Sequence, residues 1–416
     1  MNKINMNKIM ALGLLVGVVA GGSAQAQEAG GNLLLRKLVE KGVLSQKEAD
    51  ELLVESQREA EQQFTMWQAA PDLPSWVQKL SMKGDLRLRS DNISKNGDTG
   101  TANRMRWRYR LRYGVAATLN DEWMVGFRLA SGGQDDAIST NQTLDDDGEN
   151  DMLNIDQAYA KWTPNDSMTV IFGKMANTFS FDKAIIDGDY TPEGIAFNYE
   201  RDLAENHSFG LGAAGWVIKE KEDATKDGYA LVLQATLDST LSSTMSSHLG
   251  VGTYTFINTD AGHTEDSKNG GNSATGQYNP IIIDGALTYK ESSVPIKLGA
   301  SYITNPAVDQ DDSGYLLGIT FNEAKKPGAW ELGYQYRRLE ADSLWDNWTD
   351  SDFGAWGVGG TASDFKAGTD IKGHMVRGKY QINNAMQAVA TAFLSESMNN
   401  KSDDATRIVV DVIFKF

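Results

Sequence analysis

The stretch NRMRWRYRLRY, residues 103–113, decides the fold because arginine occupies every second position. Five arginines alternate with apolar or aromatic residues: Arg104, Arg106, Arg108, Arg110 and Arg112 against Met105, Trp107, Tyr109, Leu111 and Tyr113. A helix would scatter the arginines around its axis, whereas a strand places them all on one face. The stretch therefore predicts a β-strand with one cationic face and one aromatic face.

The cationic face of this strand is expected to be wet. Neighbours on one strand face lie about 6.7 Å apart, and in a dry core each guanidinium would cost several kcal/mol of desolvation. The aromatic face suits hydrocarbon and its interface with water. A sheet with water inside and lipid outside is a transmembrane β-barrel.

The rest of the chain repeats strand signals from residue 79 onward. Sixteen strands are predicted near 79–90, 103–119, 121–132, 151–162, 167–175, 193–200, 206–218, 227–237, 243–257, 280–290, 293–303, 312–322, 328–340, 372–382, 384–394 and 405–416. Tight turns alternate with long loops around 91–102, 132–150, 258–279 and 341–371. Short periplasmic turns and long outer loops are typical of outer-membrane barrels. We predict an all-β, antiparallel barrel of about 16 strands over residues 79–416.

Composition agrees with an exported barrel. The chain of 416 residues has no cysteine, a net charge of −17 and 9% aromatic residues, which does not suggest disorder or a disulfide scaffold. Its mean hydropathy of −0.40 fits strands that are half polar. The acidic balance argues against nucleic acid as a partner.

The N-terminus predicts a signal peptide over residues 1–26. Lys3 and Lys8 precede the apolar run ALGLLVGVVAGG, and Ala24-Gln25-Ala26 fits the small-x-small cleavage rule. Cleavage leaves 37 basic and 56 acidic residues, a net charge of −19. A retained anchor is the alternative, although the apolar run is short for a membrane span.

Residues 27–78 predict a short periplasmic helical segment and a linker. NLLLRKLVEKG (32–42) has helical apolar spacing, and Ser45-Gln46-Lys47-Glu48 is typical of a capping box that begins a second helix. Pro71 and Pro74 mark the boundary with the barrel. The segment is interpreted as a spacer or a weak self-association element, with oligomerisation or cell-wall contact as the alternatives.

The C-terminal RIVVDVIFKF ends in Phe414 and Phe416 on the apolar face of the last strand. A terminal Phe on such a strand looks like the signal read by the barrel insertion machinery. Together with KGDLRLR (83–89), the upstream LVEKGVLSQKEADELL and the signal peptide, it makes the chain resemble the putative porin family of Gram-negative bacteria. The resemblance implies a pore in the outer membrane and leaves the solute open.

Alternation places a group of basic residues on the predicted lumen side. They are Lys83, Arg87, Arg89, Arg104, Arg106, Arg108, Arg110, Arg112 and Arg128, against Asp85 as the one acidic residue of the first three strands. The other proposed lumen acids are scattered singly at Asp156, Glu200, Asp284, Glu331 and Asp411. This wall is expected to favour anions locally.

The segment ANTFSFDKAIIDGDYTPEG (176–194) is the candidate constriction loop. Its apolar anchors are Phe179, Phe181, Ile185 and Ile186, and its acidic residues are Asp182, Asp187, Asp189 and Glu193. It takes the place of the third long loop, which trimeric porins fold into the lumen. Folded inward, its carboxylates would face the arginines across the pore.

Enzyme and metal signals are weak. Residues 210–215 match the dinucleotide fingerprint but lie in a strand pattern, and four scattered histidines give little support to a catalytic triad. The acidic loops TLDDDGEND (143–151) and DQDDSG (309–314) lack the residues of an EF-hand. No enzyme, metal site or cofactor is predicted, and weak binding of divalent cations that bridge to lipopolysaccharide stays open.

The function predicted from these features is a porin that is expected to form a homotrimer and to allow passive diffusion of small hydrophilic solutes and ions across the outer membrane. Its expected partners are outer-membrane lipid, lipopolysaccharide and the insertion machinery. The alternative is a structural or envelope-tethering protein with a plugged barrel.

Overall fold

A computed structural model describes most of the barrel. The described residues are 79–97, 100–133, 137–220, 227–258, 272, 277–291, 293–355, 368–399 and 403–416, with the single residues 39 and 41. The predicted signal peptide (1–26) and helical segment (27–78) thus lie outside the described residues, apart from those two positions. No helix of the described part is long and apolar enough to cross a membrane.

Antiparallel strands make up nearly all of the regular structure. They are β1 (Leu80–Gly97), β2 (Gly100–Thr118), β3 (Trp123–Ala130), β4 (Gln142–Thr143), β5 (Asn154–Asn165), β6 (Met168–Lys174), β7 (Glu193–Ala204), β8 (His207–Lys219), β9 (Gly228–Thr240), β10 (Met245–Ile257), β11 (Ile281–Tyr289), β12 (Ile296–Thr304), β13 (Ser313–Phe321), β14 (Trp330–Leu339), β15 (Ile371–Gln381), β16 (Met386–Ser397) and β17 (Asp404–Lys415). Two 3-10 turns, η2 (Asp146–Gly148) and η4 (Asp346–Trp348), lie in loops.

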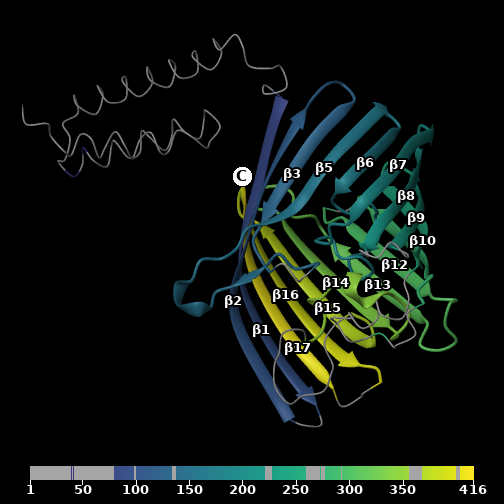
Figure 1. Ribbon diagram of the computed structural model, residues 1–416. Helices are drawn as coiled ribbons and strands as arrows, with labels where there is room; N and C mark the ends of the chain where they lie inside the picture. Colours follow the sequence, from purple (N-terminus) through teal and green to yellow (C-terminus); the bar gives the residue numbers. More distant parts are fainter. Residues whose placement is uncertain are drawn as a thin grey trace, which may run out of the picture. The chain divides into compact units, whose positions relative to one another are not determined.

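The sheet closes on itself. Each long strand pairs with its neighbours along the chain, and β17 pairs with β1 (Figure 1). The two-residue β4 pairs only with β2, so sixteen long strands form the closed barrel. Each of the sixteen predicted strands overlaps one of them, and the predicted fold class is confirmed.

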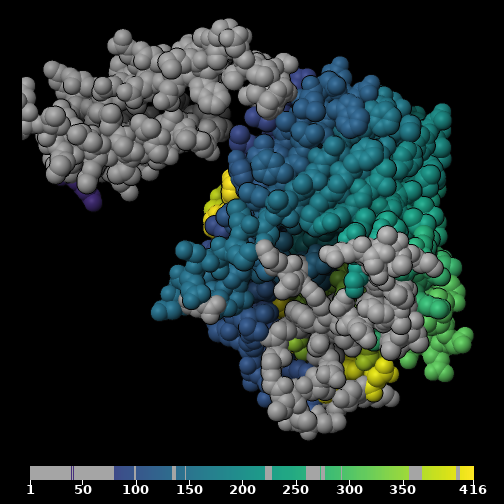
Figure 2. All heavy atoms as spheres, viewed as in Figure 1, coloured from purple at the N-terminus to yellow at the C-terminus, as the bar shows by residue number. Residues whose placement is uncertain are grey.

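The two faces of the strands differ as the alternation predicts. On β2, Trp107 is 57% exposed on the outer face, whereas Arg106 and Arg110 on the inner face are buried. The outer face of β9 likewise exposes Leu231 and Leu233. In Figure 2 the atoms of β5 to β8 form a continuous outer surface of the barrel wall. This apolar outer surface is what a strand wall presents to lipid.

One predicted loop is wrong. Residues 91–102 were expected to form a long loop, but β1 continues to Gly97 and β2 begins at Gly100. The polar sequence SDNISKNG (90–97) predicts a loop because its alternate residues do not form an apolar face. The extension adds Asp91 to the inner face, in phase with Arg87 and Arg89.

The C-terminal residue closes the seam between the last strand and the first. The backbone NH of Gly84 donates to the carbonyl of Phe416 (2.7 Å), and the Phe416 NH donates to the carbonyl of Gly84 (3.1 Å). A Cβ on Gly84 would lie 2.3 Å from the Phe416 ring, so glycine leaves room for it. Phe416 is therefore part of the barrel closure.

Deleting Phe416, or replacing it with Asp, is expected to slow barrel assembly. Deletion removes both hydrogen bonds to Gly84, and Asp puts a charge on the outer face. Heat-modifiable electrophoretic migration of outer-membrane fractions measures the folded yield, with Phe416→Tyr as the matched control. Wild-type yield in both altered proteins would contradict the expectation.

Single cysteines test the register, because the chain has none of its own. Spin labels at Trp107 and Trp330 are expected to be shielded from polar relaxation agents, whereas labels at Ser301 and Thr320 on the inner face should be accessible. Equal accessibility at all four positions would show that the assigned faces are wrong.

Candidate functional site

Two long loops pack against the inner faces of the strands. Loop 175–192 follows β6, and loop 340–355 follows β14. In the first, Phe179 and Phe181 are 8% and 7% exposed, and Ile185 and Ile186 are fully buried or nearly so. In the second, Leu344, Trp345, Trp348 and Phe353 are buried. Both loops were predicted from the sequence, but only the first was expected to fold inward.

Glycines on the wall make room for the first loop. A Cβ on Gly212 of β8 would lie 2.9 Å from the ring of Phe179, and one on Gly252 of β10 would lie 2.5 Å from the ring of Phe181. The two phenylalanine rings stack on each other at 5.9 Å. Gly212, part of the sequence that resembled a dinucleotide motif, thus serves packing inside a barrel.

Aromatic side chains join the two loops to the wall. Trp348 packs on Trp216 of β8 (5.4 Å between ring centroids), on Tyr254 of β10 (4.9 Å) and on Tyr190 of the first loop (5.4 Å). The NH of Asp187 donates to the Trp348 carbonyl (2.6 Å). The loops therefore form one apolar unit on the β8–β10 side.

Carboxylates of the same two loops contact the arginines of β1, β2 and β17. We define the arginine ladder as the inward-facing guanidinium groups of β1, β2 and β17: Arg87, Arg89, Arg106, Arg108, Arg110, Arg112 and Arg407. Asp189 of loop 175–192 pairs with Arg110 (3.2 Å) and Arg112 (2.9 Å). Asp352 of loop 340–355 pairs with Arg89 (3.0 Å) and Arg407 (3.0 Å).

Strand carboxylates complete the pairing of the arginine ladder. Asp85 binds Arg110 (2.7 Å) and Arg112 (2.8 Å), and Asp411 binds Arg89 (2.7 Å). Asp91 binds Arg106 and Arg407. The expectation of a wet, loosely solvated arginine face is wrong, because most of these groups are buried against fixed carboxylates.

The ladder nevertheless keeps an excess of positive charge. Its seven guanidinium groups meet five carboxylates, Asp85, Asp91, Asp189, Asp352 and Asp411. Arg87 and Arg108 have the weakest pairing, each 4.0 Å from a carboxylate, and both donate to Asn141. A net charge of two thus remains on the arginine ladder.

The loop carboxyl groups differ in their proton affinity. Burial opposes ionisation of Asp189 and Asp352, but the arginines beside them, foremost Arg110 and Arg89, hold the pKa of each carboxyl below its usual value. Burial and, second to it, the charge of Asp350 raise the pKa of Asp187 to about 8. Asp187 is therefore mainly protonated at pH 7 and packs without repelling Asp350.

The remaining site residues predicted from the sequence lie elsewhere. Arg128 pairs with Asp156 on the neighbouring strands β3 and β5. Lys83 and Arg104 are exposed near opposite ends of the β1–β2 hairpin. Asp182 accepts from Gln335 of β14 (2.9 Å). Glu193 pairs with Lys174 in phase with the outward Ile195, so it does not join Asp189.

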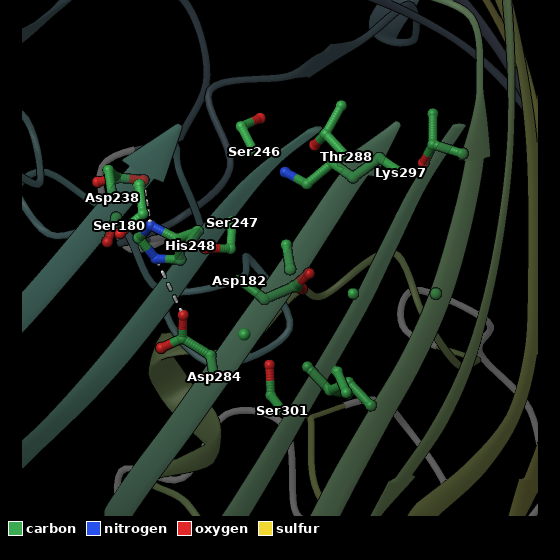
Figure 3. A pocket seen from close by; sticks show the side chains of 18 of the residues that line it. Ser180, Asp182, Asp238, Ser246, Ser247, His248, Asp284, Thr288, Lys297 and Ser301 are labelled. Carbon is green, nitrogen blue, oxygen red and sulfur yellow. Dashed lines mark hydrogen bonds and ion pairs between the residues drawn. The ribbon is translucent and has the colours of Figure 1, made fainter. Parts of the chain in front are cut away.

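Further acids and histidines line a cavity of about 840 Å³ along the inner faces of β8–β15. His248 lies between Asp238 (2.8 Å) and Asp284 (3.2 Å), as Figure 3 shows. Glu331 pairs with Lys379 (2.6 Å). In the part of the chain that the structure describes, no group of three or more potential ligands is arranged to hold a metal ion.

Comparison with known families identifies the chain. The family model described as putative porin matches residues 95–283 and 284–416, which is more than half of the sequence. The chain belongs to the putative porin family. No curated protein matches it.

Solved porins share the barrel. OprB of Pseudomonas putida in its high-pH structure aligns with a TM-score of 0.53 at 11% identity, covering 82% of this chain and 96% of that chain. OmpF of Salmonella typhi in complex with daunomycin (TM-score 0.48, 11% identity, 81% and 97% covered) and the outer-membrane channel DcaP of Acinetobacter baumannii (0.46, 12%, 81% and 97%) also match. The family and the fold make this chain an outer-membrane porin, as predicted.

Proposed function

We propose that this porin is a passive diffusion channel for small hydrophilic solutes, narrowed where loops 175–192 and 340–355 approach the arginine ladder. The observation that carries the proposal is the pairing of Asp189 and Asp352 with ladder arginines. Fixed charges along the wall of a confined, water-containing passage produce a local field that selects among charged solutes. The excess positive charge of the ladder favours anions where the two loops narrow the passage.

Transport by diffusion, without catalysis, is part of the same proposal. The guanidinium groups of the ladder bind carboxylates of the strands and of the loops, which is what a rigid selective wall requires. We further propose a homotrimer, insertion by the barrel assembly machinery and contact of the outer loops with lipopolysaccharide. The signal peptide (1–26) and the periplasmic segment (27–78) complete the proposed chain organisation.

Swelling of proteoliposomes in isotonic solutions of uncharged solutes tests this function. Entry of arabinose-sized solutes, with rates that fall as solute size rises, is expected of a water-filled passage. Empty liposomes supply the baseline. Swelling no faster than that baseline would favour the second candidate, a plugged structural barrel, because both loops pack inside the wall.

A further inference from the structure

The cavity along β8–β15 has an acidic pole. His248 of β10 is held between Asp238 of β9 and Asp284 of β11 (Figure 3). The Asp284 side chain is 12% exposed, and its Oδ1 accepts no hydrogen bond from the described residues. Asp182 of loop 175–192 projects into the same cavity. The carboxylates of Asp182, Asp238 and Asp284 lie here around one histidine, so this end of the cavity attracts a cationic group.

A basic pole lies further round the same wall. Arg377 of β15 lines the cavity and donates to Thr391 Oγ1 (3.4 Å) and to Met375 Sδ (3.3 Å). Lys297 of β12, on the strand beside Asp284, lines the cavity between Asp284 and Arg377. Within the described ranges, no carboxylate lies within ion-pair distance of Arg377 or Lys297. Their charge is therefore available to an anionic group.

A strip without long side chains connects the two poles. Ala286, two residues beyond Asp284 on the same face, is in register with Gly299, which is in register with Gly318. On the next strand Gly333 is paired with Thr320, two residues from Gly318, and also with Arg377. A Cβ on Gly299 would meet nothing closer than 3.9 Å. We call Ala286, Gly299, Gly318 and Gly333 the bare track.

We propose that the bare track binds short zwitterionic peptides, with the ammonium group at Asp284 and the carboxylate at Arg377. The proposal rests on the proposed function, since the peptide would be a solute passing through the channel. Asp284 of β11 and Arg377 of β15 are four strand spacings apart, about 19 Å, and Arg377 lies four residues, about 13 Å, beyond the position in register with Asp284. The two Cα atoms are therefore about 23 Å apart, and an extended peptide of about six residues has a similar length, at about 3.4 Å per residue.

The chemistry of the two poles selects against other solutes of this size. A peptide with only a positive end is repelled at Arg377 and Lys297, and one with only a negative end is repelled at Asp284 and Asp182. A neutral peptide meets neither attraction. Because no side chain fills the track, the side chains of the peptide itself are not restricted.

Block of the KCl current through the purified full-length protein in a planar bilayer tests the proposal. The probes are hexaalanine and its three capped forms, N-acetyl-hexaalanine, hexaalanine amide and N-acetyl-hexaalanine amide. Hexaalanine is expected to reach half-block at a concentration at least about fivefold lower than any capped form, as partly exposed ion pairs allow. Asp284→Asn and Arg377→Gln should each raise its half-blocking concentration about fivefold.

Glycine variants separate the track from a general effect on the barrel. Gly318→Leu is expected to abolish the preference for hexaalanine, whereas Gly378→Leu, in the outward phase of β15 with open space around it, should leave it unchanged. Equal block by all four peptides, or an intact preference in Gly318→Leu, would overturn the proposal while the channel function stands. Absence of KCl current in the wild type would overturn the channel function as well.

Discussion

Replacing Arg106, Arg108 and Arg110 with glutamine is expected to make the channel prefer cations. The ladder would then have four guanidinium groups against five carboxylates, so its net charge changes sign from two positive to one negative. We expect the zero-current potential across a tenfold KCl gradient to move by roughly 10–20 mV toward the cation limit of about 59 mV. The shift should be larger at low salt, where screening is weaker.

Arg201→Gln is the matched control for this triple variant. Arg201 is exposed in the outward phase of β7, so its loss removes a positive charge without touching the ladder. A zero-current potential that stays at the wild-type value in the triple variant at low salt would mean that the ladder does not face the conducting path.

Gly212→Leu is expected to release loop 175–192 from the wall and enlarge the passage. The new side chain would occupy the place of the Phe179 ring, which also packs edge-on against Trp216 at 5.6 Å. Losing the burial of one phenylalanine costs about 3 kcal/mol, which shifts the ratio of docked to undocked loop by about 100-fold. Single-channel recordings should show a higher, noisier conductance.

Gly378→Leu serves again as the control, because it adds the same side chain to the outer face. Wild-type conductance in Gly212→Leu, with the folded yield unchanged, would show that the loop does not limit the passage. A loss of folded protein is distinguished by the heat-modifiable migration of each variant.

The strands could be predicted from the sequence because their signal is local. Alternation along 103–113 or 229–237 depends on neighbours in one strand, and lipid on one face with water on the other enforces it. The 91–102 hairpin end was missed because Ser90, Asn92 and Ser94 give its outer face no apolar residues. A strand end without an apolar face lacks the two-residue alternation of apolar and polar side chains by which a strand is recognised.

The pairing of the arginines could be predicted only in part. Asp189 belonged to a loop whose apolar anchors Phe179 and Ile185 signalled an inward fold. Asp352 was missed, although Trp345, Trp348 and Phe353 in its own loop carry the same signal of buried aromatics among acids. Which arginine each carboxylate meets depends on hydrogen bonds between residues that are 15 to 322 positions apart in the chain, and periodicity does not report these.

Single-channel conductance of the purified protein in a planar bilayer tests the claim of a water-filled, charge-lined passage most directly. We expect discrete conductance steps that grow less than proportionally with KCl concentration, because the excess charge of the ladder concentrates anions when bulk salt is low. No steps at any salt concentration, from protein whose heat-modifiable migration shows a folded barrel, would contradict an open channel and favour a plugged barrel.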